Sequence, residues 1–309
     1  MSTVEPHASL SRTPGMRVTI TGASGLIGTQ LVERLRARGD DVTTLSRTPS
    51  APGAVAWQPE DEPAPAEALA GRDAVVHLAG ENVAQRWNDD VKRRIRSSRE
   101  RGTRNLVAGI EAADPRPRVL VSSSAVGFYG PHGDERLDEQ AAAGSDFLAD
   151  VCVVWEREAF RAADHGLRVV TLRTGIPLDQ GGGALATMLP FFKLGVGGPV
   201  AGGEQYMSWI HVDDVVGLYV AALDGEAWEG PVNASAPEPV TNKVFSRALG
   251  RALHRPALAP VPGLAVRALY GGMAEIVTKG QRVVPRRAQE LGYTFAHPDL
   301  DEALRSALD

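Results

Sequence analysis

The chain has 309 residues, of which 43% are hydrophobic and 23% are charged, and this composition predicts a globular protein with a large core. The net charge of −5 argues against nucleic acid or an anionic membrane as the main partner, and no apolar run reaches the roughly 20 residues that a membrane span needs. Cys152 is the single cysteine, which excludes an intrachain disulfide and favours a reducing, cytoplasmic location.

Residues 1–15 contain proline, serine and histidine but no hydrophobic segment, so we expect a disordered leader there and not a signal peptide. The first predicted strand, residues 16–21, then runs into a turn with glycines at positions 22, 25 and 28. Ile27, Leu31, Val32 and Leu35 follow at helical spacing. A strand, a glycine turn and a helix in this order are typical of dinucleotide binding.

Each glycine of this turn has an expected role. Gly22 permits the tight turn, Gly25 lets the backbone approach a pyrophosphate, and Gly28 lets the helix pack against the strand. The N–H groups at the start of the helix then face the phosphates. The cofactor contacts predicted in this segment are Gly22, Ala23, Ser24, Gly25, Leu26, Ile27 and Gly28.

The second predicted strand, residues 41–45, indicates which dinucleotide binds. An acidic residue about 20 positions after the glycine turn would bind the ribose 2′-hydroxyl of NAD, but no carboxylate lies between Val42 and Gln58. Ser46 and Arg47 instead offer a hydroxyl and a planar set of donors suited to a phosphate. We therefore predict NADP(H) as the cofactor, the alternative for Arg47 being a solvated loop position.

Strand and helix patterns alternate through the first half of the chain. Strands are predicted at 74–78, 119–121 and 168–172, and helices at 89–113 and 147–165, with Asp89 and Asp90 capping or charging the first of these helices. Residues 209–212 are predicted to form a strand that returns to the sheet, followed by a helix capped by Asp213 or Asp214.

This alternation predicts an α/β protein with a Rossmann-type, doubly wound parallel sheet and a smaller C-terminal substrate lobe. The dinucleotide-binding domain is expected at residues 16–175, with its sheet completed by about 206–225. The substrate lobe is expected at residues 176–205 and 226–309.

Several motifs occur in a characteristic order: Thr21–Gly28, Val75–Gly80, Gly102–Leu106, Ser122–Ala125 and Trp209–Val215. In this combination the chain resembles the extended and atypical short-chain dehydrogenase/reductases of the NAD(P)-dependent epimerase/dehydratase group. It is most similar to an epimerase-like subfamily of unassigned substrate that is often labelled nucleoside-diphosphate-sugar epimerase. The resemblance covers residues 16 to about 308 and is more specific for fold and cofactor than for reaction. Further cofactor contacts are accordingly expected at Leu78, Ala79, Gly80, Arg99 and Ser122.

The chain departs from this family at the residues that transfer protons. The family's Tyr-x-x-x-Lys pair is absent from the whole sequence, and Leu148 and Cys152 stand at the two positions. A positioned proton donor contributes about 10²- to 10⁴-fold in rate, so family-style chemistry is expected to be slow unless another group supplies the proton. Arg99 also replaces an asparagine that is usual in the family.

Ser124 aligns with the family serine that hydrogen-bonds the reacting oxygen, and we predict it as the residue that orients the substrate. Tyr129 is a candidate substitute acid, with a rim position and no chemical role as the alternative. His211 can pair with Asp213 or, as we favour, bond locally beside a helix cap. The histidines and the cysteine show no metal-ligand spacing, so no metal is expected.

Two functions remain open at this point. The first is an NADP(H)-binding oxidoreductase or epimerase that acts on a hydroxyl or carbonyl, with a nucleotide sugar as one candidate substrate. The second is an NADP(H)-binding sensor or interaction protein that has lost catalysis. In either case we expect a cytoplasmic monomer or homodimer that binds a small molecule, and neither nucleic acid nor membrane.

Overall fold

The computed structural model describes residues 15–49, 53–257 and 259–309, so the predicted leader lies almost wholly outside the described residues. Its centre is a sheet of seven strands, all paired in parallel, in the order β11-β7-β5-β4-β1-β2-β3. The strands are β1 (Arg17–Thr21), β2 (Asp41–Ser46), β3 (Ala54–Ala56), β4 (Ala74–His77), β5 (Val119–Ala125), β7 (Arg168–Thr174) and β11 (Gly230–Ala234). This arrangement confirms the predicted doubly wound α/β fold.

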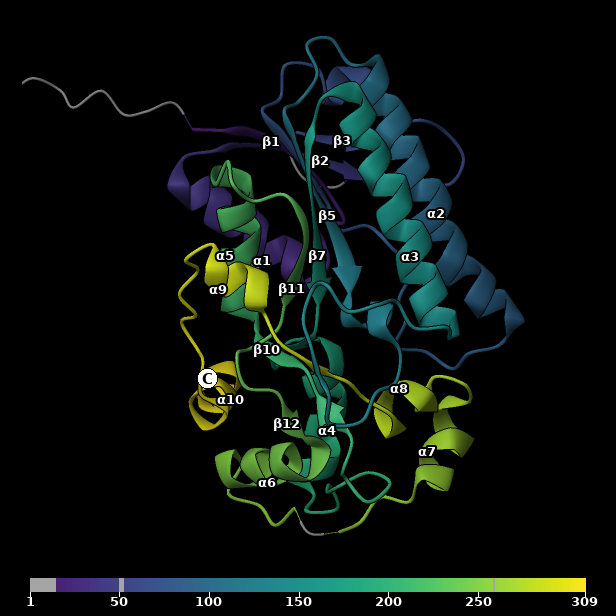
Figure 1. Ribbon diagram of the computed structural model, residues 1–309, viewed down its shortest axis with the longest axis vertical. Coiled ribbons are helices and arrows are strands. Elements are labelled where there is room, and N and C mark those ends of the chain that lie inside the picture. Colours follow the sequence, from purple (N-terminus) through teal and green to yellow (C-terminus); the bar gives the residue numbers. More distant parts are fainter. Residues whose placement is uncertain (1–14, 50–52, 258) are drawn as a thin grey trace, which may run out of the picture.

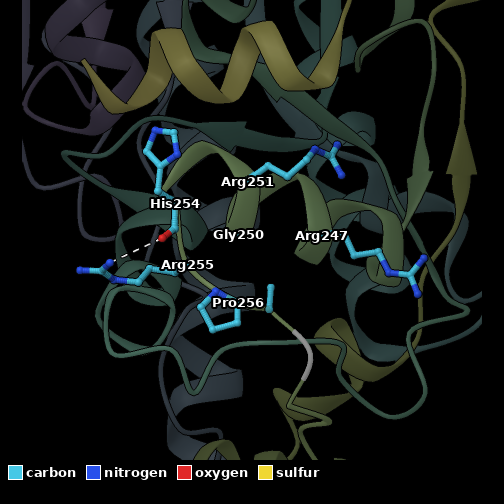
Figure 2. Close-up of a pocket in the computed structure, with 7 residues that line it drawn as sticks. Arg247, Gly250, Arg251, His254, Arg255 and Pro256 are labelled. Atoms are coloured by element: carbon cyan, nitrogen blue, oxygen red, sulfur yellow. Dashed lines mark hydrogen bonds between the residues drawn. The ribbon is translucent and has the colours of Figure 1, made fainter.

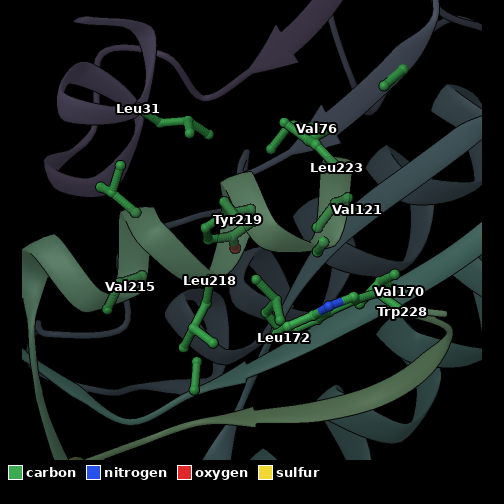
Figure 3. Close-up of a cluster of buried hydrophobic side chains, with 14 of the residues drawn as sticks. Leu31, Val76, Val121, Val170, Leu172, Val215, Leu218, Tyr219, Leu223 and Trp228 are labelled. Carbon is green, nitrogen blue, oxygen red and sulfur yellow. The ribbon is translucent and has the colours of Figure 1, made fainter. Parts of the chain in front are cut away.

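Helices cover both faces of the sheet (Figure 1). On one face lie α1 (Leu26–Arg38) and α5 (Val212–Asp224), and on the other lie α2 (Asp89–Ala112) and α3 (Phe147–Phe160). Figure 3 shows the core beneath α1 and α5, where Leu31, Val76 and Tyr219 are fully buried. The hydrophobic spacing of α1 is explained by this packing, because Leu31, Val32 and Leu35 all point into that core.

Side-chain caps fix where several helices begin. Asn88 accepts a hydrogen bond from the Val91 N–H at the start of α2, and Asp146 does the same for the Ala149 N–H of α3. Asp89 and Asp90 lie inside the first turn of α2, where their negative charges interact favourably with the positive end of the helix dipole. Of the two roles predicted for this acidic pair, the structure thus supports charging and not capping.

A second lobe lies beyond one end of the sheet (Figure 1). It contains three strand pairs: β8 (Ile176–Leu178) with β10 (Trp209–His211), β9 (Tyr206–Met207) with β12 (Val240–Thr241), and β6 (Arg136–Leu137) with β13 (Arg282–Val283). Its helices are α4 (Gly183–Lys193), α6 (Asn242–Ala252), α7 (Gly263–Tyr270), α8 (Ala274–Thr278) and α10 (Leu300–Leu308), and α9 (Arg286–Glu290) packs beside β11. Three-residue to five-residue 3₁₀ turns complete the chain: η1 (Ala66–Ala68), η2 (Val126–Tyr129) and η3 (Arg161–His165). No helix within the described ranges is long and apolar enough to cross a membrane.

The structure corrects one prediction about the sheet. Residues 209–211 form a strand, but β10 pairs with β8 and not with the central sheet. The strand that completes the sheet is β11, at residues 230–234, whereas the prediction placed it within 206–225. Helix α5 of the predicted segment does pack against the sheet, through Val215, Leu218 and Tyr219.

Candidate functional site

The three glycines of the turn after β1 differ in what surrounds them. Gly22 has a φ of +71°, and a Cβ on Gly28 would lie 2.3 Å from the Gly22 carbonyl oxygen. A Cβ on Gly25 would meet nothing closer than that same oxygen, at 3.4 Å, so the protein itself leaves that side of Gly25 open. This geometry fits the predicted roles of a tight turn, an approach for a ligand and close helix packing.

The start of α1 is suited to an anion. Gly25 is its N-cap residue, no side chain caps the helix, and no acidic residue lies in the first turn. The first N–H groups of a helix have no partner within the helix and carry the positive end of its dipole. A pyrophosphate at this position would therefore be held by backbone donors.

Arg47 follows the carboxyl end of β2 and is exposed, and it forms no ion pair with any described residue. The Ser46 hydroxyl accepts a hydrogen bond from the Thr48 N–H, which holds the loop beside β2. The strand order places this loop on one side of β1, as a contact to the adenosine half of a dinucleotide requires. The roles of Ser46 and Arg47 toward a 2′-phosphate stay predictions.

The end of β4 lies against the glycine turn on the other side of β1. A Cβ on Gly22 would lie 2.7 Å from both the Ala79 nitrogen and the Leu78 carbonyl carbon. His77 is fully buried here, between the hydroxyls of Thr21 (2.7 Å) and Thr103 (3.0 Å), and its burial lowers its pKa to about 3. The neutral imidazole therefore ties the ends of β1 and β4 to α2, and Leu78, Ala79 and Gly80 line the point where strand order reverses.

Ser124 lies near the carboxyl end of β5 and is 3% exposed. Its hydroxyl donates a 2.6 Å hydrogen bond to Glu156, and Arg173 donates to both oxygens of the same carboxylate at 2.8 Å. Ser122 is fully buried and donates to the Ser123 carbonyl. The structure thus places Ser124 at the predicted edge and adds Glu156, to which the sequence analysis assigned no role.

Tyr129 is completely buried and does not lie on a rim. Its hydroxyl donates to the Asn233 side chain at 2.6 Å and accepts from Arg173 at 3.0 Å. Burial raises its pKa to about 12, so it holds its proton firmly. The structure contradicts the interpretation of Tyr129 as a substitute acid, because the side chain serves to join β11 to the Arg173–Glu156 pair.

The two positions of the missing Tyr-x-x-x-Lys pair face the turn that follows Ser124. Leu148 and Cys152 on α3 both pack against Gly127, at 3.4 Å and 3.8 Å from its Cβ position. Cys152 is buried, and burial raises the pKa of its thiol to about 12. A neutral buried thiol is a poor nucleophile, so Cys152 acts here as a small apolar residue.

His211 caps α5, because its Nδ1 accepts a hydrogen bond from the Asp213 N–H at 3.1 Å. This confirms the local role, although the cap is His211 itself and not Asp213 or Asp214. The imidazole of His297 stacks on it with 3.8 Å between ring centres, and its Nε2 lies 3.4 Å from the Asp213 carboxylate. The possible ligand atoms of His211, Asp213 and His297 all lie within 4.8 Å of one another, a grouping that sequence spacing could not show. The His211 Nδ1 lone pair is already used by the helix cap, so we do not infer a metal there.

A loop of the second lobe reaches the glycine turn. Gln30 on α1 donates to Asp179 at 2.6 Å, and the Cβ positions of Gly182 and Gly183 lie 3.1 and 3.4 Å from the Leu26 side chain. Sequence reasoning did not assign this contact, and the run of glycines at 181–183 was its only signal. The loop covers one side of the place where a pyrophosphate would lie.

An open hollow of about 650 Å³ at the end of α6 is lined by Arg247, Arg251, His254 and Arg255 among others (Figure 2). No predicted site residue contributes to it, and Arg251 is engaged by Asp301. The negative end of the α6 dipole also points here, which disfavours an anion. The candidate site therefore remains the carboxyl edge of the sheet.

Comparison with known proteins agrees with this geometry. Residues 18–233 match the model of the NAD dependent epimerase/dehydratase family, and residues 261–307 match a domain of unknown function, DUF1731. The Arabidopsis thaliana "Epimerase family protein SDR39U1 homolog, chloroplastic" is 41% identical over 95% of this chain and 87% of its own length.

Two solved structures are similar along nearly the whole chain. The human epimerase family protein SDR39U1, crystallised with NADPH, has a TM-score of 0.88 and 36% identity over 95% of this chain and 100% of that one. A nucleoside-diphosphate sugar epimerase from Corynebacterium glutamicum has a TM-score of 0.79 and 36% identity, and covers 96% of this chain and 59% of that one. The cytoplasmic location stays a prediction, since one relative is named chloroplastic.

Proposed function

Since the chain belongs to the NAD-dependent epimerase/dehydratase family, we propose that it is an NADP(H)-dependent oxidoreductase or epimerase acting on a hydroxyl or carbonyl group of a small molecule. The observation that carries the proposal is the open side of Gly25 beside the uncapped start of α1. The human relative crystallised with NADPH supports the phosphorylated form of the cofactor. The relative named as a nucleoside-diphosphate sugar epimerase supports a nucleotide sugar as the substrate to test first.

Different residues of the site bind the cofactor and orient the substrate. The backbone around Gly22–Gly28 holds the pyrophosphate, and Arg47 holds the 2′-phosphate from the loop after β2. The cofactor, when bound, supplies or accepts hydride at the sheet edge. Ser124 orients the substrate oxygen, and the Glu156–Arg173 pair fixes the position of the Ser124 hydroxyl.

A second function is favoured by one specific observation. Three side chains considered as proton donors near Ser124 are each unsuited to that role. Leu148 is apolar, the Cys152 thiol is buried, and Tyr129 is bonded to Asn233. We therefore keep as the alternative an NADP(H)-binding sensor without turnover. Turnover of nucleotide sugars or carbonyl compounds by the unchanged protein, abolished in Ser124→Ala, would exclude the sensor.

The cofactor is tested by titrating the protein with NADPH and NADH and following nicotinamide fluorescence. We expect tighter binding of NADPH, and Arg47→Ala should weaken NADPH about 10- to 100-fold, because charged hydrogen bonds contribute about 1.5–3 kcal/mol. NADH affinity should not change. Arg36→Ala removes another exposed charge, from the far end of α1, and serves as the control. Binding of neither nucleotide would refute the proposal.

A further inference from the structure

Two arginines lie side by side on the short parallel strand pair of β6 and β13. Arg136 is the register partner of Arg282, and Leu137 is the register partner of Val283. Leu137 and Val283 are both buried in a small core that they share with residues of η2. Because side chains alternate along a strand, Arg136 and Arg282 both project from the opposite face of this strand pair.

These two cations have no acidic partner among the described residues. Arg136 is exposed and Arg282 is half-buried, and neither forms an ion pair there. The Arg282 Nη1 donates only a long hydrogen bond, 3.4 Å, to the backbone carbonyl of Asp134. Asp138, just after β6, is already engaged by Arg286. Like charges opposite each other on neighbouring strands repel, so this face of the strand pair lacks a compensating negative charge.

Packing holds the Arg282 guanidinium in place instead. Its Cζ lies 5.0 Å from the ring centre of Tyr206 on β9, in cation–π geometry. The strand beneath it is fixed by the Ser208 hydroxyl, which donates to the Gln281 carbonyl at 2.7 Å and accepts from the Val283 N–H at 3.1 Å. The buried Nε of Arg282 has no hydrogen-bond acceptor within the described part of the chain. A buried donor without a partner is unfavourable, and an acceptor supplied by a ligand would relieve this cost.

This arrangement is suited to one class of ligand. The planar set of donors on arginine matches the oxygens of a phosphate or carboxylate group. Two neighbouring guanidinium groups favour the phosphate, which carries a charge of about −2 near neutral pH, whereas a carboxylate carries only one negative charge. Because Tyr206 already orders Arg282, less side-chain entropy is lost when a ligand binds.

We propose that Arg282 and Arg136 form a binding site for a phosphate group, either as free phosphate or as part of a small organic molecule. This site is distinct from the proposed cofactor site. The Gln281 side chain donates to the Val126 carbonyl, so the face of β13 that meets the turn after Ser124 is the face opposite Arg282. Binding of phosphate at Arg282 and Arg136 therefore does not require NADP(H).

The site is located by arginine modification with phenylglyoxal, followed by mass spectrometry of peptides, which reports each arginine separately. We expect inorganic phosphate to slow the modification of Arg136 and Arg282. Arg267, an exposed arginine on α7, should react at an unchanged rate and serves as the control. If neither Arg136 nor Arg282 were protected, the proposal would be overturned. Protection of Arg47 alone would also overturn it, but would leave the proposed function standing.

Affinity is measured by calorimetric titration with inorganic phosphate and with methyl phosphate, in the presence of NADPH to occupy the glycine turn. Arg282→Gln should weaken binding of the phosphate group about 10- to 100-fold, because it removes charged hydrogen bonds, and Arg267→Gln should not change it. Equal affinity of Arg282→Gln and the unchanged protein would contradict the proposal.

A second variant covers the case in which Arg282→Gln does not fold. Arg136→Gln alters an exposed side chain, and it should also weaken phosphate binding several-fold. Unchanged binding in Arg136→Gln would then overturn the proposal. The two probes separate the two sources of the phosphate group. Tighter binding of methyl phosphate than of inorganic phosphate identifies an organic phosphate as the ligand, and the reverse order identifies the free ion.

Discussion

The Ser124 hydroxyl donates a 2.6 Å hydrogen bond to the Glu156 carboxylate, inside a buried network that continues to Arg173. Ser124 is therefore positioned by a carboxylate whose negative charge is balanced by Arg173. The Cζ of Arg173 also lies over the ring of Phe128, 3.4 Å from the ring centre. The residue expected to orient a substrate is thus part of the structural core of the sheet edge.

Removing one member of the Glu156–Arg173 pair should be more harmful than removing both. Glu156→Leu leaves a buried guanidinium unpaired, and we expect a loss of about 3–5 kcal/mol in the free energy of unfolding. The double change Glu156→Leu with Arg173→Met removes both charges and should cost less than Glu156→Leu alone. Urea denaturation of the unchanged protein, Glu156→Leu and the double variant measures this, and a double variant at least as unstable as Glu156→Leu would contradict it.

Within the glycine turn, one substitution should affect NADPH binding and another should affect the stability of the fold. Gly25→Ala meets no close protein atom and should fold with unchanged stability, but its methyl group should block the pyrophosphate and abolish measurable NADPH binding. Gly28→Ala places a methyl group 2.3 Å from the Gly22 oxygen and should lower the free energy of unfolding by at least about 1–3 kcal/mol. Thermal unfolding and NADPH titration of both variants give the comparison. Normal NADPH binding by Gly25→Ala would show that the ligand does not approach there.

The nucleotide-binding half could be predicted because its signals are local. The glycine turn, the strand before it and the helix after it lie within residues 16–38, and one short segment fixes the backbone of all three. The strand after residue 225 could not be predicted, because Gly230–Ala234 contains glycine, proline and asparagine and has no alternating pattern. It becomes a strand only because β7 offers a free edge.

The candidate site was predicted less completely, for a related reason. Tyr129 follows Ser124 closely in sequence, but the turn η2 directs its side chain inward to Asn233, which lies on the strand that was not foreseen. The stacking of His297 on His211 and the approach of Arg99 to Gly80 also join distant segments. Such contacts depend on tertiary packing, and one sequence carries no local signal for them.

His77 makes stability depend on pH. Its pKa falls from 6.5 to about 3 on folding because it is fully buried, so the unfolded chain binds more protons between these values. The stabilisation is fully present above pH 6.5 and is lost as the pH falls toward 3, at up to about 1.4 kcal/mol per pH unit. His77→Gln retains polar contacts to Thr21 and Thr103 but cannot be protonated in this range.

Urea unfolding at pH 7 and pH 5 should show a smaller loss of stability in His77→Gln than in the unchanged protein. His132→Gln, a change at a less buried loop position, should lose as much as the unchanged protein. Equal losses in all three proteins would mean that His77 is protonated without cost and that its burial does not hold the imidazole neutral.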